Sequence, residues 1–310
     1  MGISVTNLPK SLEPKTLAAL DGLSLRSRQI VEGLLAGSHR SPFRGVSVEF
    51  AEHREYVPGD DLRHVDWKVY GRTDKLYLKQ FVEETNMHCN LVIDSSASMR
   101  YGSEQGLSKQ EYAQCVAVAL SWLVLRNGDS AGVGIGVESL EDWLPASSHP
   151  DQLDRLIGCL QEFSTAPLSQ GTGSATFGKV LNEAAERLPQ RSVLYIISDF
   201  LTDLPLLYQG IERLRVEGHD VTLFHILDRD ELSFPFNGNL QLNALEGRQT
   251  VRVDAGVIAE RYQSLVSGFC QQLESKTRNL GADYELLVTD VNLQTALLAY
   301  FQRMQIRRAR

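Results

Sequence analysis

The stretch Leu91-Val92-Ile93-Asp94-Ser95-Ser96-Ala97-Ser98 decides the fold of this 310-residue chain. The apolar run 91–93 predicts a short buried strand, and the small polar residues after it predict a loop. Asp94, Ser96 and Ser98 are spaced by two, which in an extended turn places three side-chain oxygens on one side. Carboxylate and hydroxyl oxygens suit Mg²⁺, Mn²⁺ or Ca²⁺ better than zinc. The stretch therefore predicts a strand that ends in a hard-oxygen cation site.

Strand-like and helix-like segments alternate from residue 89 to the end of the chain. This alternation predicts parallel βαβ units, and strands that are apolar throughout, such as 193–197, predict helices on both faces of the sheet. The predicted fold class is α/β, with a doubly wound, mostly parallel sheet. The predicted strands are 91–93, 131–137, 192–197, 220–227 and 284–288, and the predicted helices are 108–125, 151–163, 178–188, 204–216, 257–276 and 292–307.

A second predicted strand also ends in an aspartate, because Asp199 follows Ile196-Ile197-Ser198. In a doubly wound sheet, ligands bind beyond the carboxyl ends of the strands, where the strand order reverses. We expect Asp199 to lie near Asp94 at that edge. An alternative interpretation remains open, in which both aspartates only cap helices and the serines only form turns.

The chain divides into two predicted parts. Residues 1–88 form an N-terminal module with a helix from Pro14 onward and a β-hairpin that carries a charged segment. Residues 89–310 form the main α/β domain, with an irregular insertion near 229–255. Within the module, alternating apolar residues predict strands near 46–50 and 76–81.

Composition excludes several classes of function. The net charge is −8 and the pI is about 5.4, so the chain lacks the basic excess of a nucleic-acid binder. The four cysteines are far apart and form no zinc or redox motif, which fits a reducing compartment. No secretion signal or membrane-spanning stretch is found, so we expect a cytoplasmic protein without membrane insertion.

Two motifs resemble known families. The segment 39–45, His-Arg-Ser-Pro-Phe-Arg-Gly, with Pro58-Gly59-Asp60-Asp61-x-Arg63-x-x-Asp66-Trp67 downstream, resembles the bacterial domain-of-unknown-function 58 family. Members of that family join this signature to a von Willebrand factor A-like domain. The pattern Asp94-x-Ser96-x-Ser98 after an apolar strand resembles the metal-ion-dependent adhesion site, or MIDAS, of such domains.

The resemblance implies a set of metal ligands and a mode of action. Asp94, Ser96 and Ser98 would hold Mg²⁺ (or Mn²⁺ or Ca²⁺) with a threonine from a second loop and an aspartate from a third. Asp199 matches the last position, whereas the threonine position falls on Ala175, so the neighbouring Thr176 is the candidate. In adhesion-type domains an acidic residue of a partner completes the site. Family members typically occur beside MoxR-type AAA+ ATPases, which implies a non-enzymatic adaptor for such an ATPase and its client protein.

The charged signature has two interpretations. It either forms an internal network that clamps the N-terminal module to the main domain, or it presents a docking surface to a partner. The even mixture of acids and bases favours the internal network. Its residues are Arg54, Asp60, Asp61, Arg63, Asp66, Trp67 and Arg72.

Two other functions are weighed against the adaptor. The second hypothesis is an enzyme, either a metal-dependent hydrolase at Asp94 or a degenerate nucleotide-binding protein at 173–180, which nearly matches a P-loop. However, Val180 replaces the hydroxyl residue of that motif, no strand precedes it, and no catalytic constellation is found, so Lys179 is expected on the surface and His225 in the core. The other alternative is a structural scaffold with a vacant metal site.

Overall fold

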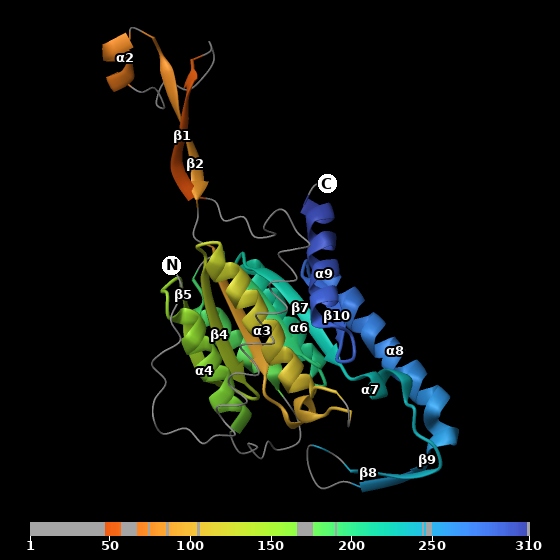
Figure 1. Ribbon diagram of the computed structural model, residues 1–310. Coiled ribbons are helices and arrows are strands. Elements are labelled where there is room, and N and C mark those ends of the chain that lie inside the picture. Colours follow the sequence, from red (N-terminus) through yellow and green to blue (C-terminus); the bar gives the residue numbers. More distant parts are fainter. Residues whose placement is uncertain are drawn as a thin grey trace, which may run out of the picture.

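A six-stranded sheet forms the centre of the molecule (Figure 1). The computed structural model describes residues 47–56, 67–73, 75–84, 87–103, 106–165, 176–189, 191–243, 245 and 250–308. Every neighbouring pair of strands in the sheet is parallel except the last, and this confirms the predicted doubly wound, mostly parallel sheet. The strand order is β10 (Asp283–Val288), β7 (Asp220–Leu227), β6 (Val193–Ser198), β3 (His88–Asp94), β4 (Ser130–Gly136), β5 (Leu140–Ser147).

Helices cover both faces of the sheet and bury two separate apolar clusters. One cluster lies under α3 (Lys109–Arg126), α4 (Gln152–Thr165) and α9 (Leu293–Arg308). The other lies under α5 (Phe177–Arg187), α6 (Leu204–Val216) and α8 (Ala255–Asn279). Successive strand side chains point to opposite faces. In β3, Leu91 and Ile93 therefore join the first cluster while Val92 joins the second.

The helix that follows the central strand begins as the sequence predicts. Ser108 caps α3: its hydroxyl accepts the Glu111 N–H at 3.2 Å, and the Glu111 carboxylate accepts the Ser108 N–H at 2.9 Å. These two bonds satisfy backbone donors that the first turn of a helix leaves unpaired. The cap fixes the start of α3 next to the 95–103 loop, because the Lys109 N–H also donates to the Tyr101 carbonyl at 2.9 Å.

Strand β5 was not predicted from the sequence. It pairs with β4 in the antiparallel direction at the edge of the sheet, and it contains Pro145, a residue that sheets tolerate in edge strands and at irregularities of the register such as the one found here. Its side chains are mostly partly buried or exposed, so it lacks the continuous apolar run of the central strands.

The N-terminal module contains a two-stranded antiparallel sheet of its own. It pairs β1 (Ser47–Glu55) with β2 (Tyr77–Glu84), and the short helix α2 (Trp67–Thr73) lies between them in the chain. The two strands occur where alternation predicts them. Neither is hydrogen-bonded to the central sheet in the part of the chain that the structure describes.

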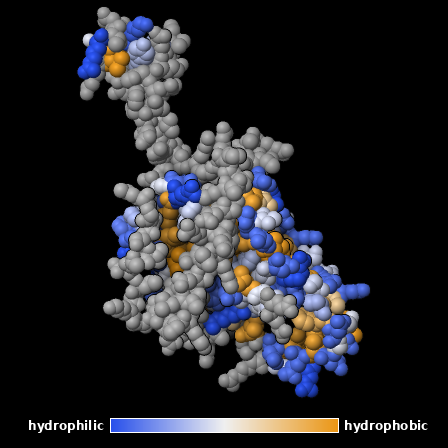
Figure 2. All heavy atoms as spheres, in the orientation of Figure 1, coloured by the Kyte–Doolittle hydropathy of each residue, from blue (hydrophilic) through white to orange (hydrophobic). Residues whose placement is uncertain are grey.

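The segment 229–255, predicted as irregular, contains defined elements. The short helix α7 (Arg229–Ser233) is followed by an antiparallel hairpin of β8 (Asn239–Asn243) and β9 (Thr250–Asp254). Apolar residues lie opposite each other across this hairpin, Leu240 with Val253 and Leu242 with Val251. Leu242 and Val251 are exposed, and Figure 2 shows apolar residues among polar ones at the lower right, where Figure 1 places β8, β9 and the start of α8.

None of the helices in the described ranges combines the length and the apolar character needed to cross a lipid bilayer. None of the four cysteines, all of which lie in the described ranges, forms a disulfide. Cys89 and Cys115 are buried, as expected for small apolar core residues.

Candidate metal centre

The candidate site lies where the direction of sheet winding changes. β3 and β6 are neighbours at the centre of the sheet, with β4 and β5 on one side and β7 and β10 on the other. The connections that leave these two strands diverge, which opens a crevice beyond their carboxyl ends. Asp94 is the last residue of β3, and Asp199 follows the last residue of β6. The structure thus places both aspartates at the switch point, as the sequence predicts.

The first group of oxygens comes from the 94–98 loop. Asp94 Oδ1 accepts the Ser96 N–H at 2.8 Å, and the Ser96 and Ser98 hydroxyl oxygens are 3.0 Å apart. All three side chains are buried. The Asp94 bond holds the loop in a tight turn, so the spacing of two does bring the three side chains together.

The second group comes from the end of β6. The Ser198 hydroxyl donates to Asp94 Oδ2 at 2.5 Å and accepts the Phe200 N–H at 2.7 Å. Phe200 is buried and has a φ of 54°, a backbone conformation that bulky residues rarely adopt. This turn aims Asp199 back toward the crevice, where Asp199 Oδ1 accepts the Leu201 N–H at 3.2 Å. Ser198 was not predicted as a site residue.

Asp199 acts on the ionisation of Asp94. Burial, and next the negative charge of Asp199, raise the pKa of Asp94 to about 7. Hydrogen bonds from Ser198 and Ser96 act in the opposite direction. Two neighbouring carboxylates at a buried site favour a cation between or beside them.

A positively charged side chain, that of Lys109, lies beside these carboxylates, and the sequence did not predict it. The Lys109 ammonium lies 2.7 Å from Asp199 Oδ2 and 2.7 Å from Glu231 Oε1, and the Lys109 side chain is completely buried. Burial lowers the pKa of Lys109, but the charges of Asp199 and Glu231 outweigh it, so the pKa lies above its ordinary value. Lys109 therefore remains charged at neutral pH.

One sequence signal points to Lys109. A lysine in the first turn of a helix opposes the helix dipole, whose N-terminal end is positive. Lys109 occupies the first position of α3, directly after the Ser108 cap. A buried lysine there needs carboxylate partners, but the sequence does not reveal that they come from residues 199 and 231.

Thr176 lies at the start of α5, close to the loop that carries Asp199. The Phe177 N–H donates to the Thr202 hydroxyl at 3.1 Å, which joins the start of α5 to that loop. Thr176 Oγ1 is buried and has no hydrogen-bond partner among the described residues, and the same is true of Ser95 Oγ. Ala175, Ser174 and Thr172 lie outside those residues.

These oxygens fit a hard cation. The described residues contain no group of three or more His, Cys, Asp or Glu side chains arranged to hold a metal ion. A cation at this edge would therefore depend on hydroxyl oxygens in addition to Asp94 and Asp199. The Ser96 and Ser98 hydroxyls and the unpartnered Thr176 Oγ1 are oxygens of that kind, and hydroxyl and carboxylate oxygens suit Mg²⁺ or Mn²⁺.

Comparison with protein families agrees with the signature in the sequence. Residues 52–267, more than two thirds of the chain, match the family described as "Protein of unknown function DUF58". This chain belongs to the DUF58 family. Uncharacterized proteins of Mycobacterium bovis and Mycobacterium tuberculosis are each 29% identical to it over 234 residues, which cover 76% of this chain and 72% of theirs.

Solved structures with similar folds have much lower sequence identity to this DUF58 member. BatB from Bacteroides thetaiotaomicron is 13% identical, with 71% of this chain and 98% of that chain covered and a TM-score of 0.44. An aerotolerance-related membrane protein from Bacteroides fragilis is also 13% identical, with coverages of 70% and 98% and a TM-score of 0.45. The SpRpn10 VWA domain is 12% identical, with coverages of 69% and 94% and a TM-score of 0.37.

The DUF58 signature is only partly described by the structure. Trp67 has 61% of its surface exposed and packs edge-to-face against Tyr70, with the ring centroids 6.1 Å apart. Arg72 is also exposed. Arg54 lies in β1, and its side chain is outside the described set. The acidic and basic partners predicted for these residues, Asp60, Asp61, Arg63 and Asp66, lie outside the described ranges as well.

Two other predicted placements are confirmed. Lys179 is exposed in the first turn of α5, as expected of a surface residue. His225 is fully buried in β7, where its Nδ1 lies 2.7 Å from the Tyr284 hydroxyl. Burial lowers the pKa of His225 to about 4, so the imidazole is neutral at physiological pH.

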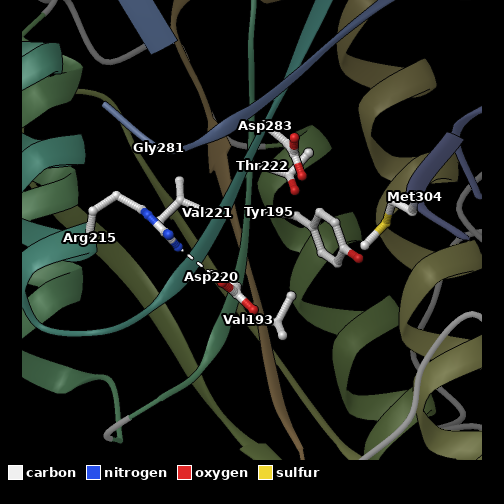
Figure 3. A pocket seen from close by; sticks show the side chains of 9 residues that line it. All are labelled: Val193, Tyr195, Arg215, Asp220, Val221, Thr222, Gly281, Asp283 and Met304. Atoms are coloured by element: carbon white, nitrogen blue, oxygen red, sulfur yellow. Dashed lines mark hydrogen bonds and ion pairs between the residues drawn. The ribbon is translucent and has the colours of Figure 1, made fainter. Parts of the chain in front are cut away.

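A cavity of about 120 Å³ lies at the opposite edge of the sheet (Figure 3). It is found at the amino ends of β6, β7 and β10, so it is separate from the Asp94 crevice. Arg215 and Asp220, which line it, form an ion pair of 3.0 Å with each other. The residues that line the cavity are Val193, Tyr195, Arg215, Asp220, Val221, Thr222, Gly281, Asp283 and Met304.

Proposed function

We propose that this chain is a non-enzymatic protein-interaction module that grips an acidic residue of a partner protein through a divalent cation. Asp94, Ser96, Ser98, Thr176 and Asp199 would hold the cation, with Mg²⁺ as the expected ion. The bound cation would supply an open coordination position that a partner carboxylate fills. The observation that carries the proposal is the meeting of the Asp94–Ser98 oxygens with Asp199 at the switch point of the sheet.

The chemistry of the crevice supports binding over catalysis. The Ser198 hydroxyl, which donates to Asp94, is fully buried and also accepts the Phe200 N–H, and the nearby His225 is buried, neutral and bonded to Tyr284. Carboxylates that are held by backbone N–H groups, as Asp94 and Asp199 are, suit a fixed ligand set. The partner that the family resemblance implies is a MoxR-type AAA+ ATPase, together with its client protein.

The main alternative is a scaffold that works without a divalent cation. Lys109 favours this alternative, because its ammonium already neutralises one oxygen of Asp199. The two functions differ in their dependence on Mg²⁺, and a binding experiment separates them.

The test is capture of a purified MoxR-type ATPase by the full chain, in Mg²⁺ and in EDTA. We expect capture in Mg²⁺ and at least a tenfold loss in EDTA. Asp94→Asn, which keeps the size of the side chain but removes its charge, should lose capture to the same extent. Asp151→Asn is the matched control, because the Asp151 side chain is exposed at the start of α4 and lies outside the site.

Equal capture by wild type and Asp94→Asn in both buffers would contradict a metal-dependent module and favour the scaffold. Circular dichroism on each variant checks that the fold survives. Hydrolysis of ATP or a phosphoester by the purified wild type, lost in Asp94→Asn, would instead point to the hydrolase.

A further inference from the structure

Lys109 has no place in the ligand set of the candidate metal centre, yet it is bonded to that set. Its ammonium contacts Asp199 Oδ2 and Glu231 Oε1, both at 2.7 Å, and it lies 5.9 Å from the centre of the Tyr101 ring. The side chain has no exposed surface. A lysine this deeply buried is uncommon unless it is paired, and here it is paired with a residue of the cation site itself.

Glu231 is held firmly in its position. It is the third residue of α7, and its Oε2 accepts the Asp228 N–H at 2.8 Å in a capping box. Asp228 is itself fully buried, and its Oδ2 accepts the Thr289 hydroxyl at 2.8 Å and the Ser103 N–H at 3.2 Å. Glu231 is therefore a fixed anchor for the ammonium.

The three charges come from different parts of the chain. Lys109 begins α3, Asp199 follows β6, and Glu231 lies in α7. Asp199 and Glu231 share one ammonium, so every movement of that ammonium toward one carboxylate weakens its bond to the other. The ammonium of Lys109 would repel a divalent cation that is bound to Asp199. Because Glu231 attracts the ammonium away from Asp199, it would reduce that repulsion.

We propose that Lys109 sets the affinity of this site for divalent cations: its tethered ammonium competes with the cation for Asp199, and Glu231 draws the ammonium away. The proposal rests on the cation site of the proposed function but not on any partner protein. It assigns opposite effects to the two residues that contact each other. An ion pair that serves the fold alone, without acting on the cation site, would leave the affinity unchanged in both variants.

The test is Mn²⁺ binding to the full chain, followed by calorimetry and by the electron paramagnetic resonance signal of free Mn²⁺. Lys109→Met removes the ammonium and keeps much of the length of the side chain, so we expect the Kd for Mn²⁺ to fall at least tenfold. Glu231→Gln removes the carboxylate that draws the ammonium away, so we expect the Kd to rise at least threefold. Lys276→Met is the matched control, because Lys276 is exposed in the last turn of α8. This variant should bind Mn²⁺ with the same Kd as wild type.

Lys109→Met leaves the buried Asp199 carboxylate and the partly buried Glu231 carboxylate without their cation and is the variant most prone to misfold. The double variant Lys109→Met/Glu231→Gln removes one charge of each sign and keeps the test valid. It should bind Mn²⁺ more tightly than wild type, because the competing ammonium is gone. Thermal melts with and without Mn²⁺ provide a second readout, in which added Mn²⁺ should raise the melting temperature of Lys109→Met more than that of wild type.

A folded Lys109→Met or double variant that binds Mn²⁺ no more tightly than wild type would overturn the proposal, and so would a lower Kd for Glu231→Gln. If wild type shows no binding at millimolar Mn²⁺ but Lys109→Met binds, this proposal holds and the metal-dependent function fails. If wild type binds and Lys109→Met is unchanged, the proposed function stands and this inference fails.

Discussion

Two fully buried serines show what a hydrogen bond contributes at the residue scale. The Ser198 hydroxyl donates to the Asp94 carboxylate at 2.5 Å, whereas the Ser121 hydroxyl, inside α3, has no partner among the described residues. Hydrogen bonds to charged groups contribute more than neutral ones, and a buried hydroxyl without a partner contributes nothing that offsets its lost hydration. The two serines should therefore differ in their contribution to stability.

Ser198→Ala should lower the free energy of unfolding by about 1–3 kcal/mol, because Asp94 loses a donor in a buried site. Ser121→Ala should be neutral or slightly stabilising, by up to about 0.5 kcal/mol, since alanine is the better helix former. Urea denaturation of both variants measures the difference. Equal losses would mean that the Ser198–Asp94 bond contributes little net energy.

The residues of the site fall into two groups, those that are close together in the sequence and those that are far apart. Asp94, Ser96 and Ser98 were predictable because a local spacing brings them together. Lys109 meets Asp199 across 90 residues and Glu231 across 122, and Ser198 meets Asp94 across 104. Such pairs depend on the order of strands in the sheet, which a local pattern does not specify. Asp199 was predictable only because a strand end in a doubly wound sheet has a known place.

At the scale of elements, α5 and α6 approach each other through glycines. A Cβ on Gly178 would lie 2.4 Å from the backbone carbonyl carbon and oxygen of Leu206 in α6. A Cβ on Gly210 would lie 2.9 Å from the Leu181 Cβ in α5. This close packing fixes the start of α5, and with it Thr176, against the loop after β6.

Gly178→Ala should lower the free energy of unfolding by about 1–3 kcal/mol, because the added methyl group meets rigid backbone. Gly158→Ala in α4 is the control: a Cβ there meets nothing within 4 Å. That substitution should raise stability by about 0.5–1 kcal/mol, the usual gain when alanine replaces glycine within a helix. Chemical denaturation midpoints measure both changes. A stabilising Gly178→Ala would show that the two helices can separate without cost.

The elements that the sequence predicted share one property, a clear apolar pattern. Helix 204–216 and strand 220–227 match α6 and β7 residue for residue. Strand β5 was missed because an edge strand with a proline and several polar residues has no such pattern. The β8–β9 hairpin was missed because it is short and largely exposed, so its alternation of apolar and polar residues covers only a few positions.

At the scale of the whole molecule, the core belongs to one part of the chain. Among the residues that the structure describes, both apolar clusters are formed by Met87 and residues after it. Every strand of the central sheet lies between residues 88 and 288. The β1–β2 sheet has its own hydrogen-bond ladder. From these observations we expect a main domain that is stable without the N-terminal module, and the boundary at residues 88 and 89 stays a prediction.

A chain of residues 85–310 should therefore fold cooperatively and melt within about 3 °C of the full chain, a difference that corresponds to about 1 kcal/mol for a domain of this size. It keeps Met87, whose N–H donates to Asp129 Oδ1 at 3.0 Å. The control, residues 85–288, lacks α9 and with it the core residues Leu293, Leu297, Tyr300 and Phe301, and it should lose near-UV circular dichroism. Calorimetry compares the three proteins. A melting temperature of the 85–310 chain more than about 10 °C below that of the full chain would mean that the N-terminal module packs against the main domain and stabilises it by several kcal/mol.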